Sequence, residues 1–287
     1  MSHRHDINHH RHRLSEIREI MNSMKTLAYM ETRKLSSFIH AQQDLVDSIE
    51  SVAADFLAFH NDALPETETE IPVYLLMGTE RGFCGDINQH LLSQFSAALH
   101  HTTHATTSHL IVIGHKLHLL LENDTRVAAF ISGANISEEV PNVLQHVVQT
   151  LAELQKQQGA LTLYALYHAG EYGVAMNRLL PPFQSLQHKQ VPYSHPPILN
   201  IPPAEFLLEL TDHYLFAALN EMLYTSLMAE NHRRVMHLEG AVQHLDDESL
   251  ELMRKSNQLR QEEITEEIEV ILLSADSLTT APKGKRV

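Results

Sequence analysis

The sequence predicts an α/β protein in which N- and C-terminal helices pair as a long antiparallel coiled coil around a central α/β domain. Three observations predict this fold: a heptad pattern near the start, a proline-free helical stretch near the end, and strands alternating with helices between them. The predicted segments are a tail over 1–13, a coiled-coil helix over 14–60, an α/β domain with its connector over 66–203, a coiled-coil helix over 204–278, and a tail over 279–287.

The first thirteen residues are basic and rich in histidine. No apolar segment follows them, so they do not form a signal peptide. Histidine is a common metal ligand, but the spacing here fits no known ligand pattern, and we expect this tail to be disordered. Residues 279–287 are expected to be a second flexible tail. The histidines of the first tail are His3, His5, His9, His10 and His12.

The first long helix is predicted from apolar residues at alternating steps of three and four between Leu14 and Phe56. This heptad pattern runs for about six repeats, and only Glu31 and Gln42 interrupt it. The stretch contains neither proline nor glycine, and such a helix is roughly 60 Å long. Because its apolar stripe is narrow, the helix needs a partner helix along its length.

The middle of the chain alternates between strand and helix patterns, which predicts a Rossmann-like domain with a parallel-rich sheet covered on its faces. Seven prolines between Pro181 and Pro203 indicate a connector back to the last helix. The expected strands are 71–79, 109–114, 126–132 and 161–168, and no clear strand follows the last of these. The expected helices are 87–101, a short helix that ends at Leu121, and 137–158.

The last long helix is predicted over 204–278, where Gly240 is the only glycine and no proline occurs before its end. It contains two apolar rows, one broken at Asn231, that are out of register near Asp246, so the seam must shift or the helix must bend there. At about 75 residues it approaches 110 Å. It is therefore longer than the first helix, and part of it must pack elsewhere or extend alone.

Composition excludes several classes of protein. A formal charge of -15 is unfavourable for nucleic-acid binding, and acidic runs such as Asp246–Glu248 are typical of solvated helix faces. Cys84 is the single cysteine, so the chain has no internal disulfide framework. No apolar run reaches the roughly 18 residues of a membrane-spanning helix.

The glycine-rich segment 78–88, GTERGFCGDIN, follows a predicted strand and raises the possibility of a nucleotide site. Neither G-x-x-x-x-G-K-[ST] nor G-x-G-x-x-G is present, so we expect no cofactor here. A tight strand-to-helix turn is the better interpretation. We expect Arg81, Gly82, Cys84 and Gly85 to form it, with Gly82 and Gly85 supplying unusual backbone angles.

Other candidate groups do not form a catalytic site. Cys84 has His90 nearby, but nucleophilic catalysis needs an oriented base, and we expect a small buried thiol. His232 and His237 are five residues apart, whereas two ligands on one helix face need a spacing of three or four. We interpret Arg233 and Arg234, close to Glu230, as a surface charge cluster. The chain is therefore predicted to be a mechanical or scaffolding part without a catalytic or metal site.

Three separated blocks of sequence resemble one known family, the gamma subunit of F-type ATP synthases. The first block is IMNSMKTLAYMETRKL (20–35), the second is TERGFCGDIN (79–88), and the third is 257–278. The identities with the family motifs are Ile20, Met24, Lys25 and Ala28; Arg81, Gly82, Cys84, Gly85 and Asn88; and Asn257, Arg260, Gln261, Ile264, Thr265, Glu267, Ile271, Ala275 and Leu278.

This resemblance implies a central rotor shaft that couples ion-driven rotation of a membrane ring of c subunits to conformational change at catalytic beta subunits. It implies alpha, beta and epsilon-type subunits as further partners, one copy per complex, and a peripheral position on the cytoplasmic face of the inner membrane. It also implies contacts with the beta subunit. The residues expected to make them are Met24, Lys25, Arg260, Gln261, Thr265 and Glu267.

Several positions depart from the family motifs. The C-terminal block has Val270, Ser274 and Ser277 where the family has Glu, Gly and Ala, and Asp86 replaces a glycine. These departures indicate a divergent branch, for which we hypothesise a second, alternative F-type enzyme that is sometimes sodium-translocating. The alternative interpretation is a non-rotary coiled-coil adaptor with an α/β head, and a nucleotide-dependent catalyst ranks last.

Overall fold

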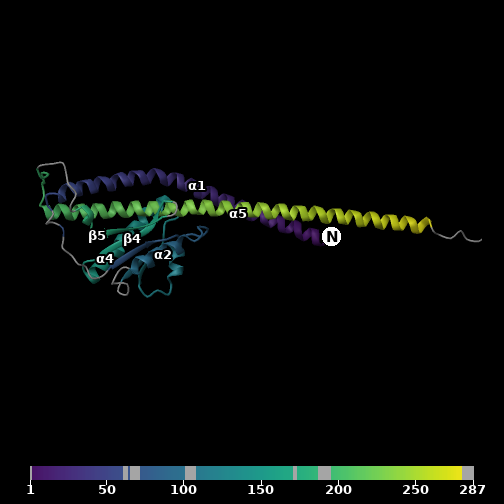
Figure 1. The fold of residues 1–287 in the computed structure, drawn as a ribbon, viewed down its shortest axis with the longest axis horizontal. Helices are drawn as coiled ribbons and strands as arrows, with labels where there is room; N and C mark the ends of the chain where they lie inside the picture. Colours follow the sequence, from purple (N-terminus) through teal and green to yellow (C-terminus); the bar gives the residue numbers. More distant parts are fainter. Residues whose placement is uncertain are drawn as a thin grey trace, which may run out of the picture. The chain divides into compact units, whose positions relative to one another are not determined.

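The computed structural model describes residues 2–60, 64, 72–100, 108–170, 173–186 and 195–279. The chain divides into two compact units. One unit joins the chain up to Lys25 with the chain from Leu238 onward, and the other is Thr26–His237. Two helices, α1 (Ser2–Leu57) and α5 (Pro203–Thr279), contribute to both units (Figure 1). Among the described residues, no helix has both the length and the apolarity needed to cross a membrane.

The start of α1 corrects one expectation. Residues 1–13 are predicted to be a disordered tail, but α1 is already helical from Ser2. The heptad spacing that includes Leu14 continues backward to Ile7, and both side chains are buried. No proline or glycine interrupts this stretch, so the seam extends the helix beyond its predicted start. The second predicted tail, 279–287, lies outside the described residues after Thr279.

In the first unit the two helices pair antiparallel. Successive contacts ascend α1 while they descend α5, beginning with Arg4 Nη1, which lies 2.8 Å from Glu263 Oε2. Ile7 and Leu14 of α1, and Leu238 and Val242 of α5, supply buried apolar side chains. The other polar contacts along the pair are Asn8 with Ser256, Arg18 with Asp246, and Lys25 with Glu239.

The second unit contains a five-stranded sheet in the order β3-β2-β1-β4-β5. The first four strands are parallel, as predicted, and β5 is antiparallel to β4. β5 was not predicted. As an edge strand it buries only Leu179 fully, so its sequence lacks the apolar run that identifies a central strand. The strands are β1 (Pro72–Met77), β2 (His109–Ile113), β3 (Val127–Ile131), β4 (Thr162–Ala169) and β5 (Gly173–Leu180).

Helices cover both faces of this sheet. The connecting elements are α2 (Ile87–His100), α3 (His115–Leu120), the 3-10 turn η2 (Ser137–Glu139), α4 (Val140–Gln158) and η3 (Gln184–Leu186). Every residue of β1 is buried, as expected for a central strand covered on both sides. On one face α2 contributes Leu91 and Phe95, which pack against Tyr74 and Leu76 of β1.

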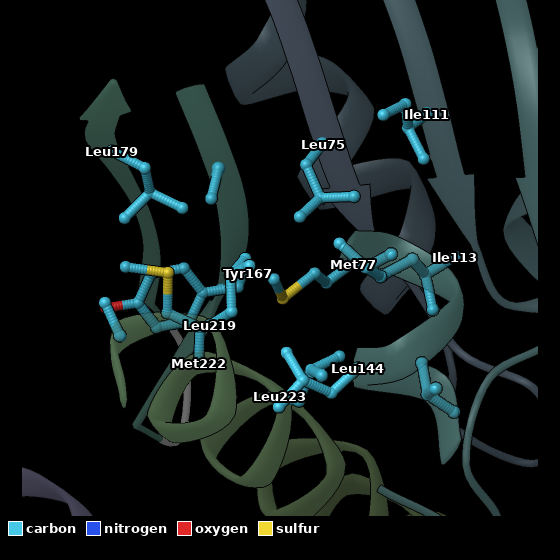
Figure 2. Packing of buried hydrophobic residues seen from close by; sticks show 14 of the residues in the cluster. Leu75, Met77, Ile111, Ile113, Leu144, Tyr167, Leu179, Leu219, Met222 and Leu223 are labelled. Atoms are coloured by element: carbon cyan, nitrogen blue, oxygen red, sulfur yellow. The ribbon is translucent and has the colours of Figure 1, made fainter. Parts of the chain in front are cut away.

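The long helices cover the other face of the sheet. Leu219, Met222 and Leu223 of α5 point toward Leu75 and Met77 of β1, as Figure 2 shows. Leu144 of α4 and Leu35 of α1 belong to the same buried cluster. The part of α5 before Leu238 is thus a core element of the α/β domain as well as a coiled-coil helix.

Candidate functional site

The predicted glycine turn lies at the carboxyl end of β1 and is tied to neighbouring elements by its polar groups. Asn88, at the start of α2, accepts a hydrogen bond from the Thr79 amide (3.1 Å) and donates one to the Thr79 hydroxyl (2.9 Å). A Cβ atom at Gly78 would lie 2.4 Å from Leu117 Cβ, so only glycine fits at the end of the strand. The turn therefore places β1, α2 and α3 in close contact.

Positive φ angles occur within this turn at Phe83 (64°) and Gly85 (65°). The expectation that Gly82 also supplies such an angle is wrong, because Gly82 has no positive φ and Phe83 adopts it instead. A Cβ at Gly85 would lie 3.4 Å from His237 Cδ2. Gly85 therefore combines a left-handed backbone with a close approach to α5.

Glu230 and Arg234 of α5 hold the turn from the other side. Their side chains form a charged hydrogen bond, and the two residues are only 5% and 6% exposed. Glu230 also accepts hydrogen bonds from the amides of Glu80 and Arg81, both at 3.3 Å, while Arg234 Nε donates to the Gly82 carbonyl at 3.3 Å. Burial raises the pKa of the Glu230 carboxyl, and the adjacent guanidinium opposes that shift.

These contacts correct the interpretation of Arg234 and Glu230 as a surface charge cluster. The pair is buried, and each charge has partners, as buried charges require. Asn231 adds a further acceptor for Arg234 Nη1, at 2.8 Å. The available sequence signal was a polar residue, Asn231, that broke an apolar row one position after Glu230.

The Glu80 carboxylate connects the ends of three parallel strands. Glu80 follows β1, and its Oε2 atom accepts hydrogen bonds from the amide of His115 after β2 (2.9 Å) and of Gly133 after β3 (2.7 Å). The next amide of α3, that of Lys116, donates to the Thr79 carbonyl. A bound phosphate would need hydrogen bonds from the amides at this sheet edge and helix start. The Glu80 carboxylate and the Thr79 carbonyl already accept those hydrogen bonds.

Cys84 is a buried thiol, as predicted. Burial, and secondarily the negative charge of Glu230, raises its pKa to about 12. Its Sγ donates weakly to the Gly82 carbonyl at 3.3 Å. A thiol with this pKa is protonated at neutral pH, so it is not an activated nucleophile. Nor do any three His, Cys, Asp or Glu side chains gather into a metal site within the described ranges.

The residues expected to contact a beta subunit lie at two separate places in the first unit. Met24 and Lys25 are half-buried on α1, and Lys25 Nζ lies 3.3 Å from Glu239 Oε2. The other group follows Arg260 on α5, and 21 residues of helix from Glu239 to Arg260 correspond to roughly 30 Å. The structure therefore does not bring the two groups together.

The second group is exposed. Arg260, Gln261, Thr265 and Glu267 all face solvent, and the Thr265 hydroxyl donates to the Gln261 carbonyl of its own helix at 2.9 Å. Apolar side chains beside them are also exposed, including Ile268 at 52%. This stretch of α5 thus exposes both polar and apolar groups to solvent.

Comparisons with known proteins match this architecture. A family model described as ATP synthase matches residues 4–278. The chain is similar to the ATP synthase gamma chain of Clostridium botulinum (strain Langeland), with 21% identity over 271 residues, covering 92% of this chain and 94% of that relative. The ATP synthase gamma chain of the Okra strain matches to the same extent.

Two solved assemblies share the fold. One is the Euglena gracilis mitochondrial ATP synthase rotor, with a TM-score of 0.58, 14% identity, and coverage of 92% of this chain and 99% of that chain. The other is the central stalk and c-ring of the Tetrahymena thermophila mitochondrial ATP synthase, with a TM-score of 0.52, 16% identity, and coverage of 77% and 99%. Since the family model matches both long helices and the sheet between them, the chain belongs to the ATP synthase gamma-subunit family.

Proposed function

We propose that this chain is the central rotor shaft of an F-type ATP synthase. In this role it couples rotation of a membrane ring of c subunits to conformational change at the beta subunits. The observation that carries the proposal is the family match from residue 4 to residue 278, which includes every element that a shaft needs. The non-rotary adaptor is less favoured, because the match is not confined to the helices.

The contacts of the α/β domain suit it to transmit torque. Leu219, Met222 and Leu223 join α5 to the sheet through apolar packing, and Glu230 and Arg234 join it to the glycine turn through charge. A force applied to the sheet therefore reaches α5 through two kinds of contact at separate positions along the helix. Close-packed interiors transmit such strain rather than absorb it.

The proposed partners are alpha and beta subunits around the helices, with the ring of c subunits and an epsilon-type subunit at the α/β domain. One copy of the chain would serve each complex, at the cytoplasmic face of the inner membrane. In this proposal the chain has no catalytic site and binds no nucleotide or metal cofactor for catalysis. Met24 and Lys25 contact one beta loop, and Arg260, Gln261, Thr265 and Glu267 contact another.

Co-expression with alpha and beta subunits tests the assignment. We expect a stable complex with one copy of this chain per three beta subunits, measured by native mass spectrometry. Failure to associate would instead support the adaptor. A reconstituted holoenzyme then tests the divergent branch: ATP hydrolysis stimulated by sodium supports a sodium-translocating enzyme, and hydrolysis indifferent to sodium removes that hypothesis.

A further inference from the structure

The histidines at the start of α1 acquire a defined arrangement because the segment is helical. In a helix with 3.6 residues per turn, positions 5, 9, 12 and 16 fall within roughly 60° of one another around the axis. His5, His9, His12 and Glu16 therefore form one stripe, with successive spacings of four, three and four. A spacing of three or four places side chains on successive turns within reach of each other.

His9, His12 and Glu16 face away from the helix pair, whereas His5, although exposed, also lines a cavity between α1 and α5 beside Arg4 and Glu263. Ile7 and Leu14, the buried residues of this segment, lie on the opposite side of α1, about 180° around the axis. All four stripe residues are exposed, and His12 Nε2 already lies 3.6 Å from Glu16 Oε1. Helix packing therefore does not occupy these imidazoles, in contrast with His10, whose Nε2 lies 3.4 Å from Glu248 of α5.

We propose that this stripe binds a divalent transition-metal ion of the zinc, nickel and copper class. The expectation that this histidine spacing fits no ligand pattern assumes a disordered tail, and the helix corrects it. Two histidines four residues apart on a helix have the spacing that holds Zn²⁺ in H-E-x-x-H sites, and imidazole nitrogen is a preferred ligand of all three ions. His5 and His9 form one such pair, and His9 forms a second pair with His12. Ca²⁺ and Mg²⁺ do not suit this site, because these ions require several oxygen ligands.

The site is a two-histidine chelate completed by water. In the described residues no three candidate ligands are already gathered around one point, so the two imidazoles turn toward a shared ion through rotamer changes of exposed side chains. An ion held between His5 and His9 links consecutive turns and opposes fraying where α1 begins. His9 belongs to both possible pairs, which makes it the central residue.

Zn²⁺ titration of the full-length chain by isothermal titration calorimetry tests this proposal. His9→Ala removes both pairs, and we expect it to weaken Zn²⁺ binding by more than the roughly tenfold that loss of an outer-shell partner costs. The double variant His5→Ala/His12→Ala leaves His9 alone and should lose binding equally. His12→Ala retains the His5–His9 pair and should bind like the wild type.

His10→Ala is the matched control, because it removes a neighbouring histidine from a different face of the same helix. We expect it to retain wild-type affinity, with equal helix content in all variants by circular dichroism. The proposal is overturned if wild-type protein does not bind Zn²⁺, if His9→Ala binds as tightly as wild type, or if His10→Ala loses as much affinity as His9→Ala. The last result would indicate a loose histidine-rich segment rather than a chelating stripe.

Discussion

The buried Glu230 carboxylate has three donors: the Arg234 guanidinium and the amides of Glu80 and Arg81. Without a compensating charge, a carboxylate at this depth would be strongly disfavoured. Arg234 provides that charge one helical turn away, and its own remaining donors reach Asn231 and Gly82. At the residue scale, this pair determines whether the glycine turn stays attached to α5.

Removing Arg234 should therefore destabilise the α/β domain strongly. Arg234→Ala leaves the buried Glu230 carboxylate without its cation, at an expected cost of about 3–5 kcal/mol in the free energy of unfolding. Urea unfolding followed by circular dichroism measures this change. Lys156→Ala, at an exposed position near the end of α4, should alter stability by less than about 0.5 kcal/mol. Equal effects of the two substitutions would contradict the assigned role of the pair.

His168 of β4 should make stability depend on pH. Burial, with secondary effects from His90 and Arg233, lowers its pKa to about 4, whereas an unfolded histidine has a pKa of about 6.5. Between these values the unfolded chain binds more protons than the folded one, so the stability present above pH 6.5 is lost as the pH falls.

Relative to a His168→Gln variant, we expect the wild type to lose about 2 kcal/mol more of its unfolding free energy between pH 7 and pH 5. Urea titrations of both proteins at the two pH values measure the difference. Parallel pH dependence of the two proteins would contradict this expectation.

The sequence was informative about the turn residues and less so about what holds them. Cys84 and Gly85 could be assigned to a turn because glycine spacing after a strand is a local signal. Glu230 is about 150 residues away in the chain, and its burial depends on the packing of α5 against the sheet. A charged residue on a helix is most often solvated, so local reasoning placed this pair at the surface.

At the scale of elements, two glycines allow opposite expectations for the same substitution. A Cβ at Gly240, in α5, meets nothing within 4 Å, so Gly240→Ala should stabilise the helix by about 1 kcal/mol. A Cβ at Gly78 would overlap Leu117 and Asn88, so Gly78→Ala should destabilise by about 1–3 kcal/mol. Thermal unfolding of both variants measures the two signs. A lower melting temperature for Gly240→Ala would show that this position needs glycine for another reason.

Elements with strong periodicity were predicted well, and elements at edges were not. The heptads of α1 and the apolar run of β1 follow directly from burial on one stripe or on both faces. β5 is half solvated and pairs with a neighbour on one side, so its sequence is nearly that of a loop. The start of α1 carries one apolar seam residue, Ile7, among polar ones. The sequence of this segment alone therefore does not predict a helix, which depends on packing against a partner helix.

At the scale of the whole molecule, the exposed stretch of α5 after Arg260 has a testable role in the assembled complex. If Arg260 contacts a beta subunit, Arg260→Ala should remove a charged hydrogen bond of about 1.5–3 kcal/mol and lower ATP hydrolysis by the reconstituted complex about tenfold or more. Arg254→Ala, at another exposed arginine of the same helix, is the matched control. Equal activity of both variants would exclude Arg260 as a contact.

The Glu80 carboxylate has a consequence for how such a molecule coexists with ATP. The Glu80 carboxylate accepts hydrogen bonds from the amides after β2 and β3, so the chain itself occupies the sheet edge at which related folds bind nucleotides. A free triphosphate would have to displace the Glu80 carboxylate, which is part of the chain and is therefore always present beside these amides. This internal carboxylate therefore disfavours binding of a nucleotide phosphate at this edge of the sheet.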